Sequence, residues 1–260
     1  MVSKIQAESG VTPDSLPHSS DWDPWLGPEG PITGNPFKSP GKPLGATGMG
    51  DVYNVVTVDG APAIRISGRV NGSIEHKRII CNYHLQLFFR WGQKKSESAV
   101  LNSGLLYHSF GPPGGGFNNT WAKSIEYEIM QGSVGMLLPI GLEIGLKIET
   151  AVDGKTTRFM VGGKLNTFEG PAMIQAGKDA EKPVGEWNKI ELYALDDRAI
   201  NVVNGIPVLY VQDMHVAGED KVVTPLTKGR IQLQSEGAEI FYRDITVEPI
   251  NSLPKIVPHK

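Results

Sequence analysis

Cysteine is almost absent from this chain of 260 residues, which has only Cys81. A single cysteine excludes any intrachain disulfide. Cys81 lies at the start of a predicted strand, where we expect a small, half-buried side chain.

Long apolar runs are also missing. No stretch of about 18 apolar residues occurs, and Pro139 interrupts the most apolar segment, 136–146, so we expect no membrane span. Residues 1–10 lack the apolar core of a signal peptide. The sequence therefore leaves open either a cytoplasmic protein or one whose leader has been removed.

Basic patches and familiar catalytic motifs are lacking as well. The 25 Lys and Arg residues against 28 Asp and Glu give a net charge of -3, with no basic stripe, so we expect no nucleic-acid partner. There is no CxxC, P-loop, GxSxG or HExxH motif, and the six histidines show no ligand spacing.

Glycine and proline are abundant instead, at 31 and 19 residues, and no helical period of useful length appears. Short runs alternate polar and apolar residues, as strands with one buried face do. Asp59-Gly60 and Asn204-Gly205 are hairpin-turn signals. We predict strands over 52–58, 63–67, 83–91, 101–109, 124–130, 145–151, 156–161, 165–168, 187–195, 199–203, 206–211, 230–235 and 240–250. Strands this short and numerous predict an all-β fold, a two-sheet antiparallel sandwich in one domain.

Three regions follow from this pattern. Residues 1–48 carry a proline every few positions, which should prevent regular ladders, yet Trp22 and Trp25 are too apolar for a free tail. We expect an extended arm packed on the domain, with sugar stacking by either tryptophan as the alternative. Residues 49–251 form the sandwich, and 252–260 a C-terminal tail.

The segment 124–131 contains two acids, Glu126 and Glu128. On a strand, positions i and i+2 share a face, about 6.5–7 Å apart. Two carboxyl groups on one face repel each other and could supply a base and an acid. The alternative is an ordinary solvated strand face.

Two further segments carry polar side chains. In 102–108, Asn102 and His108 should share one face and Tyr107 the other, and His108 could carry a proton or bind a metal. In 232–237, amides and a carboxylate lie in a row, which suits a hydroxyl-rich ligand or merely protects a sheet edge. We assign catalysis to Glu126, His108 and Glu128. We assign substrate binding to Asn102, Tyr107, Trp121, Gln131, Gln232, Gln234, Glu236 and Arg65.

Seven segments occur in an order and spacing that resemble the 3-keto-disaccharide hydrolase family over about residues 50–250. They are Tyr83–Trp91, Asn102–His108, Glu126–Ile129, Glu186–Asn188, Val203–Gly205, Gly229–Gly237 and Phe241–Ile245. The resemblance implies a concanavalin A-like jelly roll, as in laminarinase-type glycosidases, and a bacterial protein exported to the periplasm or outside. It also implies substrates whose sugar is oxidised at C3, cleaved by elimination or net hydrolysis.

A C3 ketone acidifies the C2 proton, so a base and an enolate stabiliser would suffice for that reaction. We expect Glu126 to be the central residue and His108 the second. A divalent cation could polarise the ketone, although no ligand set demands one. The laminarinase-type strand reads Glu-x-Asp-x-x-Glu, whereas this chain has Gln131 at the last position. It also departs from the keto-hydrolase family that it resembles, because that family often has glutamine where this chain has Glu128. Standard retaining hydrolysis is therefore disfavoured.

Two other functions compete with an enzyme. The same face could belong to a non-catalytic carbohydrate-binding module, or the chain could be a structural domain whose arm serves assembly. The sequence gives no metal identity, linkage preference or oligomeric state.

Overall fold

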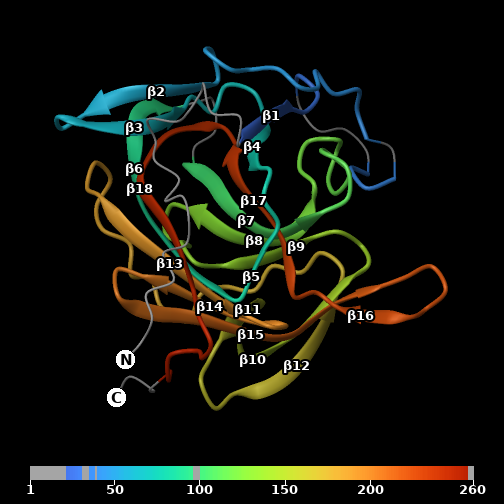
Figure 1. Ribbon diagram of the computed structural model, residues 1–260. Helices are drawn as coiled ribbons and strands as arrows, with labels where there is room; N and C mark the ends of the chain where they lie inside the picture. Colours follow the sequence, from blue (N-terminus) through green and yellow to red (C-terminus); the bar gives the residue numbers. More distant parts are fainter. Residues whose placement is uncertain (1–21, 31–34, 39, 96–99, 257–260) are drawn as a thin grey trace.

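The computed structural model describes residues 22–30, 35–38, 40–95 and 100–256, and these form two packed antiparallel sheets without a helix. Figure 1 shows β7, β8 and β17 of one sheet lying above β10, β14 and β15 of the other. The all-β, two-sheet sandwich predicted from the sequence is thus confirmed. No helix in the described part could cross a membrane.

Sheet A, the smaller sheet, has the strand order β1-β4-β17-β7-β8-β9, with β5 paired to β17. Its strands are β1 (Trp22–Leu26), β4 (Gly72–His76), β5 (Ile80–Cys81), β7 (Asn102–Phe110), β8 (Lys123–Met130), β9 (Leu137–Ile140) and β17 (Lys228–Ser235).

Sheet B has the order β11-β10-β15-β14-β13-β6-β18-β3-β2, with β12 beside β10 and β16 beside β15. Its strands are β2 (Tyr53–Val58), β3 (Ala61–Ile66), β6 (Tyr83–Lys95), β10 (Ile144–Asp153), β11 (Thr156–Phe159), β12 (Lys164–Glu169), β13 (Asn188–Leu195), β14 (Arg198–Val203), β15 (Ile206–Ala217), β16 (Val223–Pro225) and β18 (Ala238–Pro249).

The predicted hairpin turns form as expected. Asp59 and Gly60 both have positive φ, at 51° and 78°, and so do Asn204 and Gly205, at 49° and 79°. These are the angles of a type I′ turn, whose twist matches that of the flanking strands. The turns therefore fix the register of β2 with β3 and of β14 with β15.

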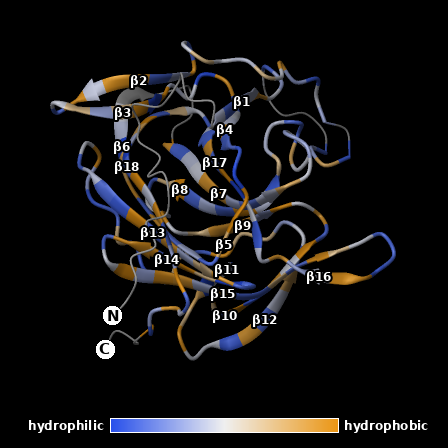
Figure 2. Cartoon of the chain, in the orientation of Figure 1, coloured by the Kyte–Doolittle hydropathy of each residue, from blue (hydrophilic) through white to orange (hydrophobic). Residues whose placement is uncertain are grey.

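The core lies between the two sheets and is built from alternate residues of each strand. Hydrophobic and hydrophilic stretches accordingly mix along the strands rather than separating into blocks (Figure 2). On β8, Tyr127 and Ile129 are fully buried in this core, in the same hydrophobic cluster as Leu85 and Leu87 of β6. The even-numbered residues of β8 therefore point away from sheet B, toward the outer face of sheet A.

The proline-rich segment does form a ladder, contrary to expectation. Residues 22–26 pair with β4 as an edge strand, where Pro24 needs no second partner for its missing N–H group. Trp22 is buried edge-on against His76, which leaves no open ring for a sugar. Residues 1–21 lie outside the described part, and the proposed boundaries at 48 and 251 stay predictions. Cys81 is exposed rather than half-buried, because its strand β5 has only two residues.

Candidate functional site

The outer face of sheet A carries a polar row across three neighbouring strands. Glu126 of β8 lies opposite Leu106 of β7, and Glu128 lies opposite Gly104. Leu106 in turn lies opposite Gln232 of β17. Directly opposed residues project to the same side of a sheet, so the two glutamates share one face, as the alternation predicts.

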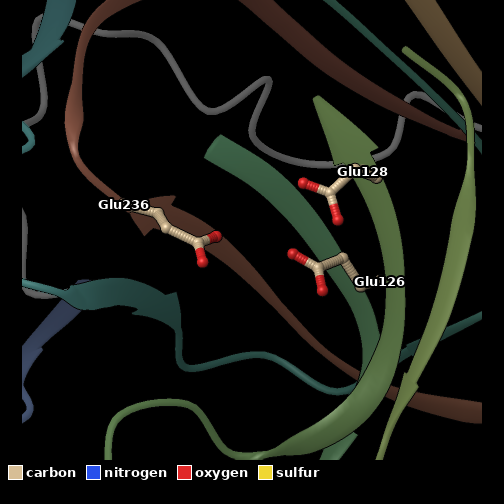
Figure 3. A group of neighbouring side chains, drawn as sticks. All are labelled: Glu126, Glu128 and Glu236. Atoms are coloured by element: carbon tan, nitrogen blue, oxygen red, sulfur yellow. The ribbon is translucent and has the colours of Figure 1, made fainter. Parts of the chain in front are cut away.

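A third acid joins this pair. Glu236 follows β17 at its turn into β18, and Figure 3 shows its carboxyl group across from those of Glu126 and Glu128 on β8. One oxygen from each of the three lies within 4.8 Å of the others. Glu126 is only 2% exposed and Glu128 only 4%. The sequence placed Glu236 among the sugar-binding residues, but nothing in it brought that residue to the acid pair.

Burial and mutual repulsion shape the electrostatics of this acid cluster, Glu126, Glu128 and Glu236. Burial, and then the charges of Glu128 and Glu236, raise the pKa of Glu126 well above its usual value, against an opposing effect of the Gln234 amide. Burial raises the pKa of Glu128 to about 8, although the side chain of Asn102 has a smaller effect that lowers it. Burial and the Glu128 charge likewise raise the pKa of Glu236. The site therefore holds less than its formal negative charge unless a cation enters it.

Gly104 and Gln234 form the floor of the cluster. A Cβ atom on Gly104 would lie 2.5 Å from Oε1 of Gln234 and 2.6 Å from Oε1 of Glu126, which is closer than real contacts allow. Gly104 does not have the positive φ that requires glycine. Position 104 therefore needs glycine because there is no room for a side chain. A glycine in the middle of a predicted strand is the sequence signal that could have indicated this close approach.

The remaining predicted binding amides divide into two groups. Asn102 begins β7 and lies beside Glu128, whose pKa it lowers. Gln232 is tied into sheet A: its Oε1 accepts from Ser73 Oγ at 2.8 Å, and its Nε2 donates to Ser109 Oγ at 2.7 Å. Gln232 thus stiffens the sheet beneath the cluster, whereas Asn102 belongs to its rim.

His108 does not join the acids, which corrects its assignment as a catalytic residue. A β-bulge interrupts the pairing after Tyr107, and His108 has a φ of 51°. This bulge turns its side chain inward, where the ring lies edge-on to Tyr83 at 6.0 Å and to Tyr107 at 5.2 Å. His108 is fully buried between the sheets. The alternation rule failed here because one extra residue reverses the face.

Tyr107 and Arg65 are also misassigned as sugar-binding residues. Tyr107 is fully buried, and its hydroxyl meets the sulfur of Met214 on sheet B at 3.8 Å. Arg65 lies on β3 and forms an ion pair with Glu239 at 2.7 Å, on the outer face of sheet B. Neither can reach a ligand on the outer face of sheet A.

Trp121 and Gln131 lie near the ends of β8. Trp121 stacks on Phe117, packs with Leu106 of the outer face, and donates from Nε1 to the Gly72 carbonyl at 2.9 Å. It is only 3% exposed, so it supports a loop over the sheet and offers little open ring. Gln131 is exposed one residue beyond β8.

Among the described residues, the acid cluster is the group with the geometry to hold a metal ion. None of the ion pairs formed by those residues includes Glu126, Glu128 or Glu236. The arrangement can therefore either move protons or bind a cation.

Comparison with known proteins gives a family match over most of the chain. The sequence model of the 3-keto-alpha-glucoside-1,2-lyase-like domain matches residues 21–248, which confirms the resemblance seen in the motifs. No curated protein matches the chain.

Solved structures resemble it more distantly. A candidate glycosyl hydrolase from Parabacteroides distasonis ATCC 8503 has 18% identity and a TM-score of 0.47, covering 78% of this chain and 87% of its own. The β-glucanase of Bacillus licheniformis has 11% identity and a TM-score of 0.42, covering 88% and 92%. The carbohydrate-binding module CBM66 of Bacillus subtilis has 9% identity and a TM-score of 0.42, covering 75% and 91%. At these values none of the three informs the chemistry of the site.

Proposed function

Because this chain belongs to the 3-keto-alpha-glucoside-1,2-lyase-like family, we propose that it cleaves the glycosidic bond of 3-keto-glycosides by elimination between C1 and C2. The observation that carries the proposal is the convergence of Glu126, Glu128 and Glu236 on the outer face of sheet A. The family supplies the substrate class, and the acid cluster supplies groups that can move a proton.

The reaction needs little from the protein beyond proton transfer. The ketone at C3 makes the C2–H bond acidic, so a carboxylate removes that proton and leaves an enolate over C2, C3 and the C3 oxygen. The enolate electrons then form a C1=C2 double bond, the C3 carbonyl returns, and the C1–O bond breaks. The departing oxygen takes up one proton, so no oxidant or reductant is consumed. Addition of water to the double bond would convert elimination into net hydrolysis.

Crowding of the carboxyl groups favours this route over ordinary glycoside hydrolysis. Inverting glycosidases hold their two carboxyl groups about 6.5–9.5 Å apart, and retaining ones about 5–5.5 Å apart, so that the acids flank the bond. Here one oxygen from each of three carboxyl groups lies within 4.8 Å of the others, and the three groups gather at one face of sheet A. One-sided clustering suits removal of a proton from one carbon.

We assign the central role to Glu126, because the charges of both Glu128 and Glu236 act on it. In this assignment Glu126 removes the C2 proton, while Asn102 and Gln234 bind hydroxyl groups of the sugar from the neighbouring strands.

The direct test incubates the full chain with a 3-keto-α-glucoside disaccharide and, in parallel, with the unoxidised disaccharide. We expect the ultraviolet absorbance of the enone and release of the second sugar only from the oxidised substrate. In heavy water, deuterium should appear at C2 of the recovered substrate and of any hydrated product, because C2 of the enone itself carries no hydrogen. Glu126→Gln should lower turnover at least about a hundredfold, the usual scale for a lost proton-transfer group.

Glu191→Gln is the matched control, since Glu191 is also a buried glutamate, 9% exposed, but lies on sheet B beside His84. It should keep wild-type turnover. Folded protein that gives neither enone nor C2 exchange would refute the proposal. Sugar binding without any turnover, retained in Glu126→Gln, would identify a carbohydrate-binding module instead.

A further inference from the structure

The acid cluster has buried polar atoms that nothing in the described structure satisfies. Oε1 of Glu126 and Oε1 of Glu128 are both buried and have no hydrogen-bond partner. Buried charged groups are normally paired, hydrogen-bonded or bound to a metal, because desolvation is otherwise too costly. Two of the three adjacent acids thus have an orphaned oxygen, and none of the ion pairs among the described residues includes the cluster, so the cluster calls for a ligand.

Gln234 points to the same conclusion independently. Its side chain is fully buried, and neither its amide nitrogen nor its amide oxygen makes a hydrogen bond of good geometry, although the amide lies close enough to Glu126 to lower the pKa of that carboxyl group. Gln234 Oε1 and Glu126 Oε1 both lie within 2.6 Å of the place that a Gly104 Cβ would occupy, so the amide is aimed at the carboxyl groups. The oxygen of this buried amide is therefore available as a fourth oxygen ligand beside the three carboxyl groups.

We propose that Glu126, Glu128, Glu236 and Gln234 bind one hard divalent cation of calcium size. All four residues offer oxygen, the donor that calcium and magnesium prefer, and no histidine or thiolate joins the cluster to select zinc or copper. Calcium lies about 2.3–2.6 Å from its ligands, so opposite oxygens can be about 4.6–5.2 Å apart, whereas magnesium holds them within about 4.2 Å. The carboxyl oxygens of the cluster are up to 4.8 Å apart, so calcium fits between them without any movement of the side chains, whereas magnesium would have to draw them together.

The cation would deepen the proposed function, on whose site this inference rests. Four protein oxygens leave coordination positions open, because calcium takes about six to eight ligands. The C3 ketone and the C2 hydroxyl of a 3-keto sugar are adjacent oxygens that can fill two such positions together. Gly104 keeps the floor low enough for both ion and sugar, since any larger residue would fill the space between Gln234 and Glu126.

The test measures binding without any sugar. The full chain is stripped with a chelator, dialysed, and titrated with Ca²⁺, Mn²⁺ and Mg²⁺ separately in a calorimeter. We expect one Ca²⁺ per chain, weaker binding of Mg²⁺, and a melting temperature about 5 °C or more higher at a hundredfold excess of Ca²⁺ over its Kd.

Variants then identify the ligands. Glu128→Gln and Glu236→Gln should each weaken Ca²⁺ binding at least tenfold, Gln234→Leu several-fold, and Gly104→Ala at least tenfold by occupying the floor. Glu191→Gln should bind like the wild type. Circular dichroism of each variant confirms the fold, and Gln234→Leu, nearly equal in volume, keeps the test decisive if a charge variant fails to fold.

Absence of stoichiometric binding at millimolar Ca²⁺ and Mn²⁺ would overturn the inference, as would binding that the three ligand variants and Gly104→Ala leave unchanged. Full turnover of the 3-keto substrate by metal-free protein would also overturn it while leaving the proposed function intact. Tight, ligand-dependent Ca²⁺ binding without turnover would support the cation site and refute the elimination chemistry.

Discussion

His108 provides a sharp test of the face assignment, because its burial predicts a specific loss of stability in acid. The ring is fully buried beside Tyr83 and Tyr107, with no carboxylate among these neighbours. Burial lowers its pKa to about 4, from a usual value of 6.5, despite a smaller opposing effect of the Leu226 backbone. The folded protein therefore keeps His108 neutral at pH values where the unfolded chain protonates it.

The magnitude follows from proton linkage. Above about pH 6.5 both states are neutral at this residue and His108 contributes no pH dependence. As the pH falls from 6.5 toward 4, the unfolded state binds more protons, so the free energy of unfolding decreases by up to about 1.4 kcal/mol per pH unit. Between pH 7.5 and pH 5 the loss amounts to about 2 kcal/mol, and it approaches about 3 kcal/mol at pH 4.

The assay compares urea unfolding of the wild type and of His108→Asn at half-unit steps from pH 7.5 to 4.5. Asparagine tolerates the left-handed backbone at this position and cannot titrate. The variant is less stable at every pH because its side chain is smaller, yet its stability should fall by about 2 kcal/mol less between pH 7.5 and pH 5. Curves with the same pH dependence would refute the burial of His108, and loss of turnover in folded His108→Asn would return it to the active site.

Three further predictions concern residues whose roles the structure changes. Arg65→Ala should lower the free energy of unfolding by about 1–2 kcal/mol in urea titrations, because it removes the ion pair that Arg65 forms with the buried Glu239; turnover should be unchanged, and a raised KM would refute this placement. Tyr107→Phe loses only a weak contact with Met214 and should cost under about 1 kcal/mol in the same titrations, with kcat and KM unaltered. Gly104→Ala should lower turnover of the 3-keto substrate at least about tenfold with an unchanged circular dichroism spectrum, because the added methyl group occupies the floor of the cluster.

Much of the fold could be predicted because its signals are local. Alternating polarity marked most of the strands, and Asn204-Gly205 specified its own turn. Even the shared face of Glu126 and Glu128 is a local property, since two residues along one strand must point the same way. The face on which each residue of a strand lies can therefore be predicted from the sequence of that strand alone.

The composition of the site was less predictable because it depends on pairing between distant strands. Glu236 meets the acids only because β17 lies beside β7, a contact between segments more than a hundred residues apart. His108 was misplaced by a bulge that has no sequence signal of its own. The sequence correctly placed Arg65 on the face of its strand opposite to the core-facing Ile64 and Ile66, but that strand belongs to sheet B, whereas the acid cluster lies on sheet A. The alternation of faces along a strand does not show to which sheet the strand belongs.

The third acid explains why this face differs from that of an ordinary glycosidase. At the position where the laminarinase-type strand has its last acid, Gln131 is exposed beyond the end of β8, and the third carboxyl group comes from Glu236 in the turn after β17. Clustered carboxylates would stabilise the positive charge of an oxocarbenium ion, but elimination from a 3-keto sugar develops negative charge on the C3 oxygen. Three bare carboxylates would oppose that charge, and a divalent cation among them reverses the sign of the local field. A divalent cation would therefore meet two needs at once: it would stabilise the negative charge that develops on the C3 oxygen of the substrate, and it would neutralise the buried carboxyl groups of the protein.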